Sequence, residues 1–206
     1  MIRVAALAIC LFLAQSAAAS VCTVDDLAGS ARAETASHRS FALERGMELE
    51  NGTLVATGRG SRLEMKFRDG LTVILGENTA FRIDDYVYVR NAPGKDRVSL
   101  TLLKGSLRVI TGLIGKLRPD AFLLRTNTAT LGVRGSDFIA SSGSHYLESL
   151  KGKVFVTNSS GRTFLESGQI GYIPTSDSSP TLVGRLPAEA AFEFAELSPT
   201  ASGEEK

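Results

Sequence analysis

Short stretches in which apolar and polar residues alternate recur along the chain and predict β-strands. In Arg62–Phe67 the apolar residues Leu63, Met65 and Phe67 alternate with three charged ones. An extended strand with this pattern buries one face and exposes the other to water. Similar alternation recurs at Thr79–Ile83, Val98–Leu102, Ser106–Val109 and Val154–Val156. Turn residues separate these segments about every eight to twelve residues, a spacing typical of an all-β sandwich, barrel or solenoid.

A tight turn is predicted where Asp69-Gly70 separates Arg62–Phe67 from a second apolar run, Leu71–Leu75. Glycine tolerates the positive φ of a type I′ turn, so this dipeptide indicates a β-hairpin with a two-residue turn. We therefore assign Asp69 to a turn rather than to catalysis.

Faint internal repetition suggests how these strands are arranged. Three segments place a glycine two residues after a leucine and continue into a strand: Leu27–Ala33, Leu103–Val109 and Leu150–Val156. A second motif, Leu-Glu-x-Gly, lies at Leu43–Gly46 and Leu165–Gly168, 16 and 15 residues after the leucine of the first and third segments. Stacked copies of such a unit predict an all-β domain of glycine-rich antiparallel strands, solenoid-like or sandwich-like. The alternative is chance similarity among glycine-rich strands.

The C-terminal part of the chain has a different pattern. Residues 174–181 have the composition of a linker, and Pro187–Glu196, within a segment spanning 186–197, is predicted to form one short amphipathic helix. Residues 198–206 have the composition of a disordered tail. The β domain itself is expected to span residues 20–185.

The first 19 residues have the features of a cleaved signal peptide. They carry one charge, Arg3, then an apolar run, and end in three alanines, which predicts export to the periplasm. No later stretch is long and apolar enough for a transmembrane helix. Without Arg3, the 23 Lys and Arg residues become 22, matching 22 Asp and Glu. A net charge of zero argues against nucleic-acid binding, which needs a basic surface.

Cysteine content excludes an internal disulfide in the exported chain. Cys10 would leave with the signal peptide, so Cys22 would be the one remaining thiol. Val21 precedes it, whereas a lipid-modified cysteine requires a small residue at that position. We expect a thiol without a specific role near the terminus, with an intermolecular disulfide as the alternative.

Several motifs, in order along residues 27–173, resemble the FecR-type periplasmic domain. The most specific is Ala-Thr-x-Gly-Val-Arg-Gly-Ser at Ala129–Ser136. The matching stretches are Gly58–Leu63 leading to Phe67–Gly70, Asn78–Tyr86, Leu103–Gly112, Thr126–Phe138, Leu150–Val154 and Leu165–Gln169.

The resemblance implies an all-β domain in the periplasm. Full-length family members relay a signal from an outer-membrane transporter to a cytoplasmic sigma factor, and they also have an anti-sigma segment and a membrane span. This sequence is expected to lack both parts, so a link to iron uptake does not follow from the resemblance. We expect a non-enzymatic interaction and signal-sensing module, without a cofactor, whose partner is an envelope or membrane protein.

Two segments are candidates for binding that partner. In Gly132–Ser136, the glycines allow close approach of another chain, while Arg134 and Ser136 offer polar contacts. The structural alternative is that Arg134 closes a turn, bonding carbonyls and Asp137. In Ile110–Leu117, Leu113 and Ile114 lie in an apolar run interrupted by two glycines. That run is either a mobile loop offered to a partner or a loop packed into the core.

Aromatic and acidic residues suggest a second function. Tyr86 and Tyr88 would share one face of a strand and, with Arg134, could bind a cell-wall glycan if that face is exposed. A strand packed on both sides is the alternative. Asp84-Asp85 supplies too few oxygens for Ca²⁺, and neither histidine has a metal-ligand spacing. We therefore predict no metal site.

A hydrolase is the weakest alternative. Ser136 with His145 could be imagined as part of a catalytic triad, with Asp137 and Ser144 nearby in sequence. The chain has no G-x-S-x-G motif, and adjacency in sequence does not indicate triad geometry.

Overall fold

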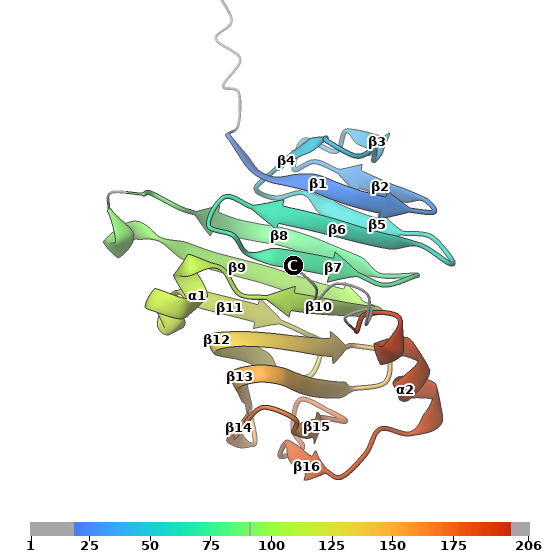
Figure 1. The fold of residues 1–206 in the computed structure, drawn as a ribbon, viewed down its shortest axis with the longest axis vertical. Coiled ribbons are helices and arrows are strands. Elements are labelled where there is room, and N and C mark those ends of the chain that lie inside the picture. The colour runs from blue at the N-terminus through green and yellow to red at the C-terminus, as the bar shows by residue number, and fades with distance from the viewer. Residues whose placement is uncertain (1–18, 91, 199–206) are drawn as a thin grey trace, which may run out of the picture.

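A computed structural model describes residues 19–90 and 92–198 (Figure 1). The predicted signal peptide, apart from residue 19, and the predicted tail, apart from residue 198, lie outside these residues. The described part is all-β with short helices. Its strands are β1 (Ser20–Ala28), β2 (Ala31–Glu34), β3 (Ser40–Ala42), β4 (Glu48–Glu50), β5 (Leu54–Thr57), β6 (Arg62–Phe67), β7 (Thr72–Leu75), β8 (Ala80–Val87), β9 (Arg97–Lys104), β10 (Ser106–Ile110), β11 (Phe122–Arg125), β12 (Thr130–Ser141), β13 (Tyr146–Asn158), β14 (Gly161–Leu165), β15 (Ile170–Tyr172) and β16 (Thr181–Val183). The helices are α1 (Leu113–Leu117) and α2 (Ala188–Ala195), with 3₁₀ turns η1 (Pro93–Lys95) and η2 (Pro119–Ala121).

All these strands belong to one curled sheet. Its main path runs β3-β2-β5-β8-β9-β11-β12-β10-β7-β6-β1-β4, so it folds back on itself at β12. β13 continues from β12 and pairs with β14 along one part of its length and β15 along another, and β16 pairs with β15. The arrangement combines the two predicted forms, because strands are stacked as in a solenoid and two halves of the sheet enclose a core as in a sandwich.

Strands pass from one half of the sheet to the other at glycine kinks. At Gly105, where φ is +81°, the chain leaves β9, which pairs with β8 and β11, and enters β10, which pairs with β7 and β12. A Cβ at this position would lie 2.6 Å from the backbone Cα of Thr79, so only glycine fits. Gly29 and Gly152, the equivalent positions in the other two repeated segments, also have φ near +80° and equally close neighbours.

The first and last repeated units have the same hydrogen bonding. The amide of Leu43 donates to the carbonyl of Ala31, two residues after Gly29, and Leu165 pairs with Val154, two residues after Gly152. Both Leu-Glu-x-Gly motifs end in a glycine with φ between +80° and +86°. The first and last units thus share their local geometry, as the predicted internal repetition expects.

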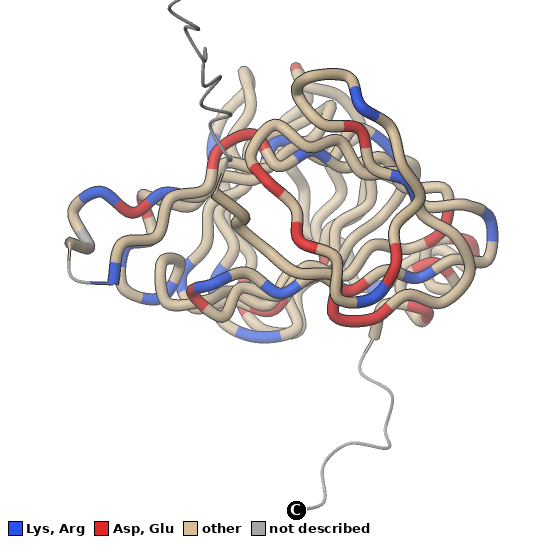
Figure 2. The backbone as a smooth tube through the Cα atoms, turned by 90° about the horizontal axis from the view of Figure 1, so that it is seen from above, with Lys and Arg blue, Asp and Glu red and all other residues tan. Residues whose placement is uncertain are grey.

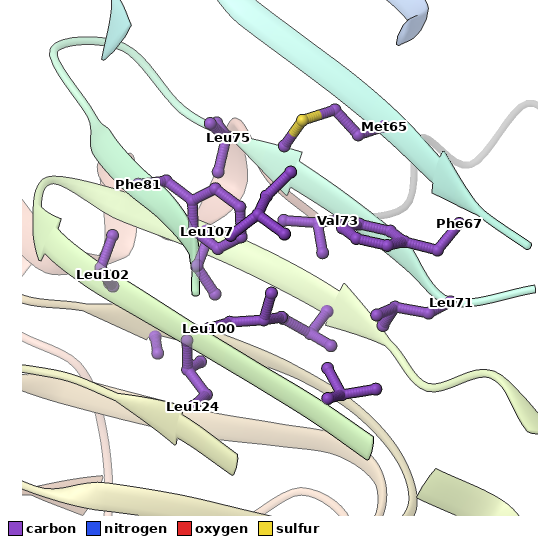
Figure 3. Packing of buried hydrophobic residues seen from close by; sticks show 14 of the residues in the cluster. Met65, Phe67, Leu71, Val73, Leu75, Phe81, Leu100, Leu102, Leu107 and Leu124 are labelled. Atoms are coloured by element: carbon purple, nitrogen blue, oxygen red, sulfur yellow. The ribbon is translucent and has the colours of Figure 1, made fainter. Parts of the chain in front are cut away.

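The core lies between the two halves of the sheet (Figure 3). Leu100 and Leu102 from β9 meet Val73, Leu75 and Leu107 from the opposite half, and all five are fully buried. Burial of such side chains contributes about 1.5–3 kcal/mol each, which makes this layer the main source of stability.

Cys22, the lone thiol expected near the terminus, belongs to the same core. It lies in β1, is only 2% exposed, and pairs with Leu49 and Phe67 on the neighbouring strands. Burial raises the pKa of its thiol to about 12. A buried, protonated thiol is unreactive, so the geometry argues against both lipidation and an intermolecular disulfide.

The hairpin between β6 and β7 is confirmed, but its turn type differs from the prediction. The amide of Gly70 donates to the carbonyl of Phe67, and Phe67 donates back to Leu71. Gly70 has φ of +85° and follows a standard turn as a bulge residue, so the loop has three residues instead of two.

The predicted C-terminal helix is confirmed as α2. Phe194 and Leu197 pack on Ile74 and Ile139, on the outer face of the sheet, in a small second cluster. The segment expected to be a linker forms β16 at its end, from Thr181. No helix in residues 19–90 and 92–198 is long and apolar enough to cross a membrane.

Candidate interaction site

The apolar run Ile110–Leu117 forms a short helix, α1, where a loop was expected. The helix is amphipathic: Ile114 is buried, whereas Leu113 is 46% and Leu117 72% exposed. It packs on β12, since a Cβ on Gly115 would lie 3.1 Å from Val133. One side of the segment therefore enters the core, as the structural alternative expected, and the other side faces water.

Asp69, in the β6–β7 turn, holds α1 in place. Its Oδ2 accepts a hydrogen bond of 3.0 Å from the amide of Ile114, and its backbone carbonyl accepts one of 2.9 Å from Leu113. Its Oδ1 accepts a further bond of 3.1 Å from the amide of Leu71. The carboxylate and the backbone carbonyl of Asp69 together accept from Ile114 and Leu113, the first donors of the helix, which have no partner within it. The predicted turn residue is thus also the anchor of α1.

Tyr86, on β8, completes this network from the opposite half of the sheet. Its hydroxyl donates to Asp69 Oδ1 at 3.0 Å and accepts from the Asp69 amide at 2.8 Å. Burial, and next the nearby Asp69 carboxylate, raise the pKa of the Tyr86 phenol above its usual value. The ring also packs against Phe67, with the centroids 5.1 Å apart.

This position contradicts the idea of a tyrosine face open to ligands. Tyr86 is 3% exposed, and Tyr88 is partly buried against the same core. The strand is packed, as the alternative interpretation expected. The glycan-binding hypothesis named Tyr86, Tyr88 and Arg134, and of these Tyr86 is unavailable to a partner.

Arg134 and Ser136 have opposite environments on β12. Ser136 is buried, and its Oγ donates to the carbonyl of Lys153 at 2.6 Å. Its own carbonyl accepts from the amide and hydroxyl of Thr111, just before α1. Ser136 is therefore a structural residue, and its prediction as a partner-binding residue finds no support in this burial.

Arg134 is exposed, and among the described residues its side chain has no hydrogen bond or ion pair. The expected contact with Asp137 is absent. Asp137 instead forms a bidentate pair with Arg108 on β10, with distances of 2.8 and 2.6 Å. The guanidinium of Arg134 thus remains available to a partner.

The hydrolase geometry is not assembled. Ser136 and His145 belong to different regions, because β12 continues to Ser141 and His145 lies in the following turn. Five strand residues span roughly 17 Å, and Ser136 Oγ is already bound to Lys153.

Acidic residues considered for metal binding are occupied by cations. Asp84 pairs with Arg82 at 2.5 Å, and Asp85 pairs with Arg97. Across the described part of the chain, no group of three His, Cys, Asp or Glu side chains could hold a metal ion.

The candidate site is therefore the exposed side of α1 together with Arg134, the exposed cation that precedes Gly135 on β12. We call these four residues the α1 surface: Leu113, Lys116, Leu117 and Arg134. Lys116 lies beside β12, because a Cβ on Gly135 would be 3.9 Å from its Cγ. Arg90 and Lys95, in the β8–β9 connection, are also exposed. Seen from above, most of the charged positions at the left edge, where this connection lies, are blue (Figure 2). The combination of apolar side chains and cations suits a partner with apolar residues ringed by acidic ones.

The fold is an all-β domain of stacked strands with glycine kinks, and a protein-family model matches part of this chain. The model described as FecR protein matches residues 53–155, half of the chain, and the chain belongs to this family. The match includes α1, Asp69, Tyr86 and Arg134. It excludes Cys22 and α2.

Solved structures agree on the fold. Two crystal structures of a proposed anti-sigma factor from Parabacteroides distasonis ATCC 8503 match with a TM-score of 0.50 and 17% and 16% sequence identity. The match covers 63% of this chain and 58% of that protein, so the two share only part of their length. A search of curated proteins found no match.

Proposed function

We propose that this chain is an exported FecR-type module that binds an envelope or membrane protein in the periplasm and thereby senses or relays a signal, without catalysing a reaction. Family membership supports a regulatory role, and FecR domains are typically periplasmic parts of membrane regulators. The structurally similar protein described as an anti-sigma factor is consistent with such a role.

The observation that carries the proposal is the α1 surface. Leu117 exposes 72% of its area to water, yet the helix that bears it is held by buried hydrogen bonds to Asp69. Rigid apolar side chains can be buried by a partner with little further loss of conformational entropy. The nearby cations Lys116 and Arg134 would steer an acidic partner toward this surface.

The first test is photo-crosslinking in the native cell. A photoreactive amino acid replaces Leu117 or, separately, Arg134, both exposed. Leu182 on β16, which is 54% exposed, provides the matched control. We expect one membrane or envelope protein to be captured from the two α1 positions and not from Leu182. Capture of glycan alone, or the same products from all three positions, would contradict the proposal.

A second test uses binding to the captured protein. Leu113→Ser with Leu117→Ser removes the exposed apolar area and leaves buried Ile114 intact, so the fold should persist. We expect affinity to fall about tenfold or more, since burying two such side chains is worth several kcal/mol at most. Leu182→Ser should leave affinity unchanged.

A further inference from the structure

A groove lies at the other end of the strands from α1. Its volume is about 770 Å³, and α2 forms one side of it. The other side is built from turns between strands, including Gly60, Gly105 and Gly143. Figure 1 shows α2 and α1 at opposite ends of the strands. The size lies in the range of small-molecule sites.

The two sides of the groove carry opposite charge. Glu189 lies on α2 and Glu196 at its C-terminal end, whereas Arg59 lies in a turn and Lys104 at the end of β9. None of these four side chains forms an ion pair or side-chain hydrogen bond within residues 19–90 and 92–198. Four free charges of two signs around one groove are suited to a ligand that carries both signs.

The remaining charged groups of the groove are already engaged. Glu77 accepts a hydrogen bond of 2.6 Å from the Gly60 amide. Glu193 accepts from Ser141 at 2.9 Å and from Ser144 at 3.0 Å. Arg62 donates to the carbonyl of Glu196 at 2.7 Å and so ties the end of α2 to the sheet. These contacts fix the shape of the groove and leave the other four charges for recognition.

An apolar contact lies between the charges. Phe192, on α2, lines the groove and is 69% exposed. Phe194, on the same helix, is instead buried against the sheet. An aromatic ring open to water in a groove is suited to covering an apolar side chain.

We propose that this groove binds a short peptide with free ends. The carboxylate of the peptide would meet Arg59 and Lys104, its amino group would meet Glu189 and Glu196, and a central apolar side chain would cover Phe192. The site is separate from the α1 surface, so the proposal does not depend on the protein partner.

The test is an NMR titration of the ¹⁵N-labelled chain with the tripeptide Ala-Leu-Ala. We expect the amide signals of Gly60, Gly105 and Gly143 to shift saturably. The same peptide with both ends blocked should bind about tenfold more weakly or worse, because it can no longer make either charged contact. Absence of a saturable shift, or equal binding of the blocked peptide, would overturn the proposal.

Variants distinguish recognition from a general effect of charge. Lys104→Gln and Glu189→Gln should each weaken binding of the free peptide about tenfold. Both residues are exposed, so the fold should be retained. Lys95→Gln removes an equally exposed cation from η1, at the other end of the strands, and should leave binding unchanged. An equal loss in Lys95→Gln would show that net charge, not the groove, controls binding.

Discussion

The hydroxyl of Tyr86 both donates to the carboxylate of Asp69, at 3.0 Å, and accepts from its amide, at 2.8 Å. This pair connects β8 to the β6–β7 turn across the core. Because Asp69 also receives the amides of Leu113 and Ile114, the tyrosine indirectly fixes the helix that carries the α1 surface. The geometry of the candidate site thus depends on a residue that no partner can touch.

Tyr86→Phe should destabilise the domain by about 1–3 kcal/mol, because it leaves a buried carboxylate and a buried amide each short of one hydrogen bond. Chemical denaturation measures the loss. Hydrogen exchange should show faster opening at the amides of Leu113 and Ile114.

The matched control is Tyr88→Phe, two residues further along the chain and just beyond the end of β8. The hydroxyl of Tyr88 forms no hydrogen bond to the rest of the described chain, so its removal should cost little. Equal destabilisation by both variants would show that the Asp69–Tyr86 pair has no special role.

The kink glycines should differ sharply in their tolerance of a side chain. Gly105→Ala combines a φ of +81° with a Cβ 2.6 Å from the Thr79 backbone. The left-handed conformation costs about 1–2 kcal/mol and the overlap adds more, so we expect a loss above about 3 kcal/mol or failure to fold.

Two control glycines separate strain from overlap. Gly46 has φ of +86° but open space around it, and Gly184 has neither a positive φ nor a close neighbour. Alanine should cost about 1–2 kcal/mol at Gly46 and less than about 0.5 kcal/mol at Gly184. Thermal unfolding of the three variants tests this order, and a different order would refute the kink explanation.

The periodic features of the sequence predicted most of the fold. Alternation identified β6 correctly, and the shared Leu-x-Gly segments identified positions where the strands kink. These features are local, because alternation and glycine kinks depend only on residues that are close together in the sequence. The helix α2 was predicted for the same reason, since its apolar positions recur at helical spacing.

The candidate site depended on contacts that no local pattern contains. An aspartate before glycine has the same sequence signature whether it faces water or anchors a helix some 44 residues later, as Asp69 does for Leu113. The α1 segment has two glycines and five helical residues, so its helix depends on Asp69. Proximity in sequence favoured Arg134 as the partner of Asp137, yet strand pairing places Arg108 on the adjacent β10.

Cys22 should resist thiol reagents until the protein unfolds. Its side chain is buried and its thiol pKa is raised to about 12, so the thiolate is scarce and shielded near neutral pH. In a Cys10→Ser background, which leaves one cysteine, we expect slow labelling in buffer and complete labelling in urea. Fast stoichiometric labelling of the folded chain would contradict the buried position.

Alkaline pH should destabilise the domain through Cys22. Its pKa is raised on folding from 9.0 to about 12, so above pH 9 the unfolded chain releases a proton that the folded chain retains. The stabilising contribution is complete below pH 9 and is lost as the pH rises toward 12, at about 1.4 kcal/mol per pH unit. Tyr86, whose pKa is raised in the same direction from 10.0, adds to the loss above pH 10.

Urea denaturation of the native sequence and of Cys22→Ala between about pH 8 and pH 11 measures both slopes. The variant will be less stable overall because it leaves a small cavity, but its stability should fall less steeply with pH. Parallel slopes for the two proteins would show that Cys22 does not control the alkaline limit.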